Sequence, residues 1–268
     1  MDADEKRARA ASFGDVAQAY ADHRPGYPAD AVRWLVSASP GRVLELGAGT
    51  GKITKAIAAL GHDVVATDTS APMLRQLKTH VQGVHTLVSQ AERIPLQTSS
   101  VDVVVAAQAF HWFDEQLALP EIARVIRPGG VLSLVWNNAD LTVPWVRKVF
   151  ALAMSGGDTD EGAGDDPVEG SDVFATSESK VFRHWQQFHR SSLIGFVASQ
   201  SRVATMAPAQ RDKVLADVGA LYDSYGRGPD GMLVPWRSHC YRARVTGLAD
   251  FRKEPAADLD DGLLIDFP

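Results

Sequence analysis

The sequence predicts an α/β protein with a doubly wound, mostly parallel sheet and helices on both of its faces. Short apolar runs alternate with amphipathic segments between residues 41 and 136, and one run ends in a glycine-rich turn (residues 43–54, VLELGAGTGKIT). The run Val101–Ala107 is apolar at nearly every position, which is typical of a strand that is buried on both faces. Because helices separate the strands, we expect parallel pairing through right-handed crossovers.

The period of the apolar residues places the individual elements along the chain. Strands are expected at residues 42–46, 63–68, 84–89, 101–107, 131–136, 180–190 and 232–245. Helices are expected at residues 4–21, 29–37, 52–60, 71–81, 115–125, 144–154, 191–199 and 209–222. Ser70 is the expected N-cap of the helix at 71–81, because a serine side chain can accept a hydrogen bond from the first turn.

Composition and charge limit the classes of protein to which the chain can belong. With 268 residues, of which 45% are hydrophobic, it is expected to form a single domain with a sizeable core. A net charge of −6 gives no reason to expect nucleic acid or an anionic membrane as a partner. One cysteine, Cys240, rules out an intramolecular disulfide, and residues 1–10 lack the apolar core of a signal peptide. These observations favour a cytoplasmic protein.

The glycine-rich turn departs from two well-known nucleotide-binding motifs. The dinucleotide fingerprint G-x-G-x-x-G/A requires glycine or alanine where this chain has Lys52. The phosphate-binding loop G-x-x-x-x-G-K-[ST] requires glycine in place of Leu46 and serine or threonine in place of Ile53. A glycine turn before a helix N-terminus still favours a carboxylate or phosphate ligand, because backbone N–H groups can approach it closely.

An acidic residue closes the second expected strand. Asp68 ends the run DVVATD and lies 19 residues beyond Gly49. A carboxylate at this end of a second parallel strand is placed to accept hydrogen bonds from both hydroxyls of a ribose. The alternative interpretation is a solvated aspartate that only terminates the strand.

The segment ELGAGTG resembles motif I of class I S-adenosylmethionine (SAM)-dependent methyltransferases, in particular the type 11 methyltransferases. Three later segments resemble further motifs of this family in the same order: SQAERIPL at 89–96, SVDVVVAAQAFHWFD at 100–114 and LPEIARVIRPGGVLSL at 119–134. The resemblance covers residues 12–136 well and extends more loosely to residue 245. It implies a Rossmann-like sheet of seven strands whose last strand is antiparallel.

The resemblance also implies a domain organisation and a cofactor. The single domain 1–268 would comprise a helical lid or cap at 1–40, a SAM-binding core at 41–136, acceptor-side elements at 137–251 with a mobile loop at 156–172, and an acidic tail at 252–268. SAM would be the methyl donor and S-adenosylhomocysteine the product. The cofactor-binding residues would be Glu45, Gly47, Ala48, Gly49, Gly51, Asp68, Thr69, Ser70, Met73, Gln90, Ala91, Glu92, Ala107 and Gln108. Gln90 stands where the family usually has aspartate, and its carbonyl could still accept from the adenine amino group.

The acceptor side is predicted from a second resemblance. Y-x-x-x-R-P-x-Y-P at 20–28, together with QAFHWF at 108–113, is similar to a branch that includes trans-aconitate and fatty-acid carboxyl O-methyltransferases. The expected catalytic residues are His111, Arg24 and Tyr20. The expected substrate-binding residues are Trp112, Phe113, Trp136, Ser201 and Trp236.

The sequence leaves several alternatives open. His111 is either a structural histidine or the base that a hydroxyl or amine acceptor needs, whereas a carboxylate is ionised at neutral pH and needs no base. The chain could also be a SAM-binding partner protein without catalytic activity. An NAD-dependent oxidoreductase is disfavoured by Lys52. No cluster of His, Cys and Asp has metal-ligand spacing, so no metal is expected. The expected partner is a small-molecule acceptor, and the expected state is a monomer or homodimer.

Overall fold

The computed structural model describes residues 24–154, 164–225 and 230–246. The expected helix at 4–21 and the expected tail at 252–268 lie outside these residues, as does the first part of the expected loop at 156–172.

The described residues form a seven-stranded sheet in the order β3-β2-β1-β4-β5-β7-β6. Its strands are β1 (Arg42–Leu46), β2 (Asp63–Asp68), β3 (His85–Val88), β4 (Val101–Ala107), β5 (Ile126–Ala139), β6 (Glu178–Phe188) and β7 (Met232–Arg244). β1 pairs in parallel with β2 and β4, whereas β7 lies antiparallel between β5 and β6. This arrangement confirms the predicted fold class, including its antiparallel last strand.

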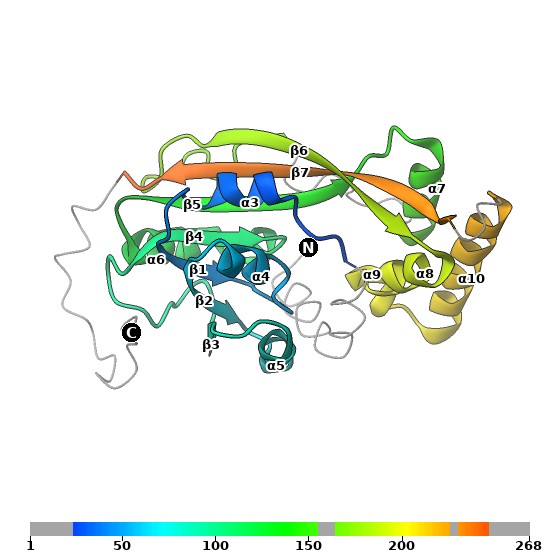
Figure 1. Cartoon of the computed structure of the whole chain (residues 1–268), viewed down its shortest axis with the longest axis horizontal. Coiled ribbons are helices and arrows are strands. Elements are labelled where there is room, and N and C mark those ends of the chain that lie inside the picture. The colour runs from blue at the N-terminus through cyan, green and yellow to red at the C-terminus, as the bar shows by residue number, and fades with distance from the viewer. Residues whose placement is uncertain (1–23, 155–163, 226–229, 247–268) are drawn as a thin grey trace.

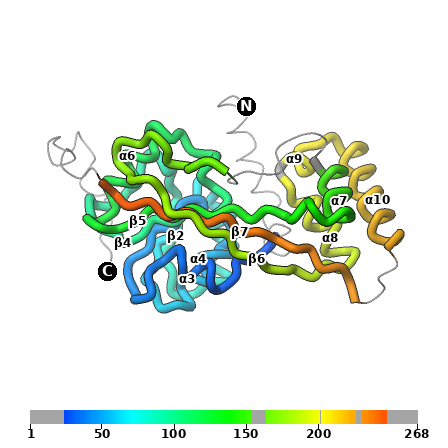
Figure 2. Tube along the Cα trace, turned by 90° about the horizontal axis from the view of Figure 1, so that it is seen from above, coloured from blue at the N-terminus to red at the C-terminus, as the bar shows by residue number. Residues whose placement is uncertain are grey.

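Helices cover both faces of the sheet. The helices are α3 (Ala29–Leu35), α4 (Lys52–Ala59), α5 (Ala71–His80), η1 (Phe110–Trp112), α6 (Glu115–Val125), α7 (Pro144–Met154), α8 (Arg190–Ala198), α9 (Ser201–Ala204) and α10 (Pro208–Ser224). Figure 2 shows α6 on one side of the strands and α3 and α4 on the other. The side chains of one strand alternate between these two layers: Val104 packs in the cluster that contains α6 residues, and Val103 and Val105 pack in the cluster that contains α3 and α4 residues.

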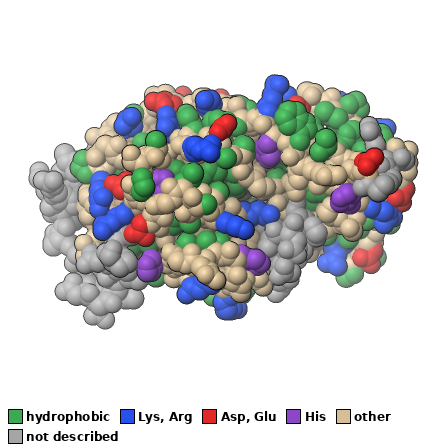
Figure 3. Space-filling model, in the orientation of Figure 1, with side chains coloured by type: hydrophobic (Ala, Val, Ile, Leu, Met, Phe, Trp, Pro, Cys, Tyr) green, Lys and Arg blue, Asp and Glu red, His purple; other side chains and the backbone are tan. Residues whose placement is uncertain are grey.

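A separate group of helices lies at one end of the sheet. Figures 1 and 2 show α7, α8, α9 and α10 gathered beyond the ends of β5, β6 and β7. They share a core with the ends of those strands, in which Phe188 and Trp236 pack against Phe196. Figure 3 shows hydrophobic side chains at the surface towards this end, among charged side chains of both signs. The sequence predicted these helices except α9, a four-residue helix that is too short for a periodic pattern.

Two local predictions need correction. The strand expected at 131–136 is longer, because Ile126 already pairs with Val101 and Asn138 still pairs with Arg237. The strand therefore includes Pro128, Gly129 and Gly130, and its register with β4 is irregular at this point. Ser70 does occupy the N-cap position of α5, but its side chain makes no capping hydrogen bond.

Candidate functional site

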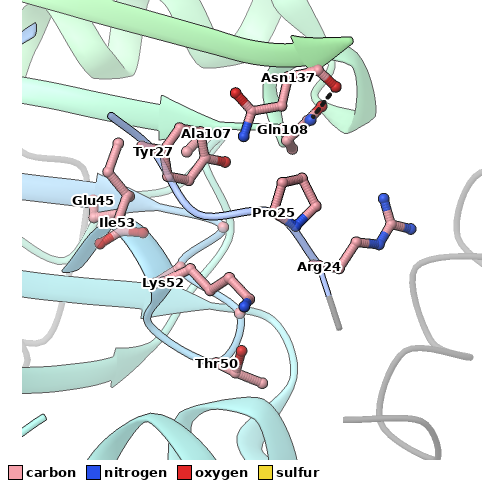
Figure 4. Close-up of a pocket in the computed structure, with 13 residues that line it drawn as sticks. Arg24, Pro25, Tyr27, Glu45, Thr50, Lys52, Ile53, Ala107, Gln108 and Asn137 are labelled. Atoms are coloured by element: carbon pink, nitrogen blue, oxygen red, sulfur yellow. Dashed lines mark hydrogen bonds between the residues drawn. The ribbon is translucent and has the colours of Figure 1, made fainter. Parts of the chain in front are cut away.

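A cavity opens where the order of the sheet reverses, at the carboxyl ends of β1 and β4. Ligands of open α/β sheets bind at such a switch point, because the loops after the two strands diverge there. The cavity has a volume of about 440 Å³ including its open mouth. It is lined by Arg24, Pro25, Tyr27, Glu45, Gly47, Ala48, Gly49, Thr50, Lys52, Ile53, Ala107, Gln108 and Asn137 (Figure 4).

The glycine turn after β1 forms one wall of this cavity. Gly47 has φ +69°, and a Cβ atom at this position would lie 2.5 Å from the Cβ atom of Ala109. Gly51 is the N-cap of α4 with φ +85°, and a Cβ atom there would lie 2.6 Å from Cγ of Leu77. Both positions therefore require glycine for conformation and for space.

Asp68 is joined directly to the glycine turn. Its Oδ2 accepts a hydrogen bond from the backbone N–H of Gly49 at 2.9 Å, and its Oδ1 accepts from the N–H of Ser70 at 2.7 Å. Burial raises the pKa of this carboxyl, while the backbone hydrogen bonds act in the opposite direction. The carboxylate thus holds the turn against the end of β2 and retains further lone pairs for a ligand.

Glu45, unlike Asp68, lines the cavity itself, and its carboxyl is almost completely buried. It is 1% exposed, and its Oε2 accepts a hydrogen bond from the Thr54 hydroxyl at 2.6 Å. Burial raises the pKa of Glu45 to about 8, and the nearby charge of Asp68 adds to the effect. With this pKa the side chain is mostly neutral at pH 7 in the protein without a ligand.

A chain of hydrogen bonds connects the far wall of the cavity to the N-terminal segment. Gln108 follows β4 with φ +55°, and its Nε2 donates to the carbonyl oxygen of Asn137 at 3.1 Å. Asn137 in turn donates from Nδ2 to the carbonyl oxygen of Gly26 at 2.9 Å and accepts from the Ser238 hydroxyl. In Figure 4, Pro25 and Tyr27 lie between this wall and the glycine turn. The segment that carries them thus passes over the cavity.

The cavity includes residues that the sequence prediction missed. Thr50 is 5% exposed, and its hydroxyl has no hydrogen-bond partner among the described residues. Lys52 and Asn137 also line the cavity. Thr50 and Lys52 stand within the glycine motif itself, and Asn137 directly follows the strand expected at 131–136. Placing ligand-binding residues throughout the turn after the first strand could have found Thr50 and Lys52.

Arg24 connects the cavity to the helical end of the molecule. A terminal nitrogen of its guanidinium donates to the carbonyl oxygen of Ser199, which caps α8, at 3.2 Å. The centre of the guanidinium lies 5.9 Å from the ring centroid of Phe196. The aromatic core of the helical end therefore begins next to the cavity.

His111 and its aromatic neighbours form a second group just beyond Gln108. The indole N–H of Trp136 donates to Nδ1 of His111 at 3.3 Å, and the His111 ring lies 4.7 Å from the Trp112 ring. Trp136 is 3% exposed and packs edge-on against Phe110. Phe113 also packs edge-on against Phe110, at 5.8 Å between ring centroids.

The other predicted site residues lie in different places. Gln90 and Thr69 are exposed, Met73 is buried in α5, and Ala91 packs in the main core. Glu92 accepts a hydrogen bond from the backbone N–H of the N-cap of α6 at 2.8 Å. Trp236 packs in the core of the helical end. Tyr20 and the side chain of Ser201 lie outside the described residues.

Two further properties concern the described residues alone. No group of three or more His, Cys, Asp or Glu side chains among them could hold a metal ion. None of their helices is long and apolar enough to cross a bilayer.

Comparison with known proteins agrees with this geometry. A family model described as a methyltransferase domain matches residues 44–134. A methyltransferase of uncharacterised function from Mycobacterium tuberculosis is 38% identical over 246 residues, which are 90% of this chain and 98% of the relative. A malonyl-[acyl-carrier protein] O-methyltransferase from Enterobacter lignolyticus is 35% identical over 150 residues, covering 54% of this chain and 59% of that protein. A solved structure assigned as a type II methyltransferase from Anaeromyxobacter dehalogenans is 26% identical, with a TM-score of 0.64 over 82% of this chain and 97% of that one.

The sheet order and the glycine turn beside an acidic strand end are those of class I methyltransferases. Because the mycobacterial relative matches along nearly its whole length, the chain belongs to the family of class I SAM-dependent methyltransferases.

Proposed function

We propose that this protein binds SAM in the cavity at the glycine turn and transfers its methyl group to the carboxylate of a small or medium-chain aliphatic acid. The observation that carries the cofactor part is the hydrogen bond between Asp68 and the N–H of Gly49, which holds a carboxylate beside the turn. In the proposed complex this carboxylate would accept hydrogen bonds from the ribose hydroxyls. The buried Thr50 hydroxyl and the space kept open by Gly47 fit a ligand with several polar groups.

The charges of the cavity also suit SAM. When bound, SAM supplies a methyl group on a positively charged sulfur, next to an ammonium and a carboxylate. The Glu45 carboxyl would face the cationic end of SAM. A cation bound beside it would lower the pKa of this carboxyl and so favour its ionised form. Lys52 and the N-terminus of α4 would favour the carboxylate of the cofactor. Gln108 and Asn137 would orient the ligand from the opposite wall.

The proposed acceptor is a carboxylate because the cavity favours anions and supplies no evident base. Its lining includes two cationic side chains, Arg24 and Lys52, and no histidine among the described residues. A carboxylate attacks the methyl carbon directly: its oxygen forms the new bond, the bond from sulfur to carbon breaks, and no proton has to be removed. The protein then has to bring the two partners together in line and exclude water.

An aliphatic chain on the acceptor would fit the adjoining aromatic core. Arg24 contacts both Ser199 and Phe196, so an acid held near Arg24 would point its chain towards the helical end. There Phe150, Phe196 and Trp236 pack with ring centroids 5.5–6.1 Å apart. The malonyl-[acyl-carrier protein] O-methyltransferases, which match about half of this chain, give additional support for carboxyl methylation.

Two other functions remain as alternatives. Methylation of a hydroxyl or an amine would use His111 as the base, and it is favoured by the position of His111 just after Gln108. A SAM-binding protein without catalytic activity would bind the cofactor but turn over no acceptor.

The test is a screen with methyl-labelled SAM against straight-chain acids from acetate to dodecanoate, matched alcohols and matched amines. We expect label in the acids, as an ester that mild alkali hydrolyses. An alkali-stable product from an alcohol or amine would refute the carboxylate proposal, and the absence of any labelled product would favour the non-catalytic alternative.

A further inference from the structure

The segment that passes over the cavity is held in place by a side chain that lines the same cavity. Asn137 donates from Nδ2 to the carbonyl oxygen of Gly26 at 2.9 Å, and it stands among the lining residues. We propose that residues 24–28 form a strap that opens to admit and release the cofactor, with Gly26 as its hinge and Asn137 as its latch. This inference rests on the proposed function, because the ligand beneath the strap is the SAM of that proposal.

The sequence of the strap leaves one residue free to turn. Residues 24–28 read RPGYP. A proline has a fixed φ, and it also restricts the residue before it. The two prolines therefore limit four of the five residues, namely themselves and their predecessors. Gly26 is the residue between the two restricted pairs.

Gly26 needs to be glycine for neither conformation nor space in the closed strap. Its φ does not lie in the left-handed region, and a Cβ atom at this position would have nothing within 4 Å. Gly47 and Gly51 differ, because both have positive φ and little space for a Cβ atom. At Gly26 the absence of a side chain instead leaves φ and ψ free to change, which is what a hinge between stiff residues requires.

The closed strap covers part of the ligand cavity. Pro25 and Tyr27 line the cavity, and Pro25 is buried. Figure 4 shows Pro25 between Asn137 on one side and Thr50 on the other. A ligand that reaches from the glycine turn to Asn137 would therefore lie beneath the strap. Its release would be hindered until the strap moves away.

The latch is oriented by a buried serine. A carbonyl oxygen can only accept, so Nδ2 of Asn137 must face Gly26 and Oδ1 must face the other way. There Oδ1 accepts from the Ser238 hydroxyl at 2.6 Å. Nδ1 of His184 lies 3.5 Å from the same hydroxyl oxygen, so the shorter bond to Asn137 takes the hydroxyl hydrogen. Ser238 is 0% and Asn137 6% exposed, so bulk water competes little for these bonds.

Other contacts of the strap limit the effect of losing the latch. Arg24 donates to the carbonyl oxygen of Ser199 at 3.2 Å. Burial lowers the pKa of His184, and a hydrogen bond to the backbone of Gly26 acts in the opposite direction. Without an oriented Asn137 the strap would thus be loosened but not released. Loss of one such hydrogen bond changes an equilibrium by roughly three- to tenfold.

The first test measures the rates at which S-adenosylhomocysteine binds and leaves, by surface plasmon resonance with the full chain immobilised. Ser238→Ala removes the hydroxyl that orients the latch, and Ser238 is not a lining residue of the cavity. We expect release to be roughly three- to tenfold faster in this variant. Gly26→Ala makes the open strap less favourable in entropy, so we expect binding and release to be about two- to fivefold slower.

Ser133→Ala is the matched control. Ser133 is 0% exposed in the same strand as Asn137, and its hydroxyl donates to the carbonyl oxygen of Leu35 at 2.6 Å. It should leave both rates unchanged. General damage to the fold would speed release in Ser238→Ala and Gly26→Ala alike, whereas a latch and a hinge predict opposite changes. Release from Ser238→Ala no faster than from Ser133→Ala, or faster release from Gly26→Ala, would overturn the proposal.

The second test needs no cofactor. ¹⁵N relaxation dispersion at the backbone amides of Gly26 and Tyr27 reports an open strap that exchanges on the microsecond-to-millisecond timescale. We expect the open population to rise in Ser238→Ala and to fall in Gly26→Ala. Equal dispersion in the unchanged protein and in both variants would overturn the proposal.

The two tests also distinguish this inference from the proposed function. An open population that responds to both substitutions, in a protein that binds neither SAM nor S-adenosylhomocysteine, would support the hinge and latch and refute the proposed cofactor site. Methylation of an acid by a protein whose release rate is the same in all three variants would support the proposed function and refute the inference.

Discussion

The substitution Glu45→Gln tests whether burial raises the pKa of a carboxyl that is almost completely buried in the described part of the chain. Glu45 is 1% exposed, and its pKa is raised from 4.5 to about 8 by burial. In the unfolded chain the same carboxyl titrates near its ordinary value. Between these two values the folded protein therefore holds one proton more than the unfolded chain does.

The sign and size of the effect follow from this difference. Because the folded state binds the additional proton, the free energy of unfolding falls as pH rises, by about 1.4 kcal/mol per pH unit between pH 4.5 and 8. This contribution is fully present below pH 4.5 and lost above pH 8. Glutamine has the same shape and stays neutral, so Glu45→Gln should lack this slope.

The assay is urea unfolding at half-unit steps from pH 5.5 to 8, followed by the fluorescence of the six tryptophans. In the difference in unfolding free energy between the variant and the unchanged protein, the contributions of the other titrating groups cancel. We expect it to shift by about 2–3 kcal/mol in favour of the variant over this interval. Glu115→Gln, at an exposed position in the first turn of α6, is the matched control and should show no such trend. A difference that stays constant with pH for Glu45→Gln would refute the reasoning.

Two further predictions follow from the same cavity. SAM binding at pH 7 should release a proton from the unchanged protein but not from Glu45→Gln. Calorimetry in buffers of different ionisation enthalpy would detect the released proton. If the binding heat depended on the buffer equally in both proteins, this prediction would be contradicted. Gly47→Ala should destabilise the fold by roughly 1–3 kcal/mol and weaken SAM binding, because the new methyl group meets Ala109 at 2.5 Å. Gly83→Ala is its control in thermal unfolding, since Gly83 has a similar φ of +74° but nothing within 4 Å, and equal losses in both variants would remove the steric argument.

The sheet was predictable from the sequence because its strands are short apolar runs with clear ends. Val101–Ala107 is one example: the predicted and observed bounds agree, since the run is buried on both faces and polar residues flank it. β5 was not predictable to the same degree. Its extension through Asn137 and Asn138 depends on pairing with β7, which comes about a hundred residues later in the chain.

In the candidate site, too, features set by the local sequence could be predicted, whereas features that depend on contacts between distant segments could not. The turn from Gly47 to Gly51 could be predicted because its conformation is a property of the local sequence. Asn137 could not, because its contribution to the cavity depends on contacts with Gly26 and Ser238 at distant positions. The contact between Trp136 and His111 likewise arises only when β5 and the segment after β4 are brought together.

The most direct test of the account is a calorimetric titration of SAM, S-adenosylhomocysteine and NAD into the unchanged protein and into two aspartate variants. Asp68 closes β2 at the glycine turn, whereas Asp63 begins the same strand at its other end and serves as the control. We predict that SAM and S-adenosylhomocysteine bind and NAD does not. Asp68→Ala should weaken SAM binding by about 1–3 kcal/mol, since charged hydrogen bonds to the ribose are lost, and Asp63→Ala should leave it unchanged. Equal SAM affinity in the unchanged protein and in Asp68→Ala, or binding of NAD in place of SAM, would contradict the account.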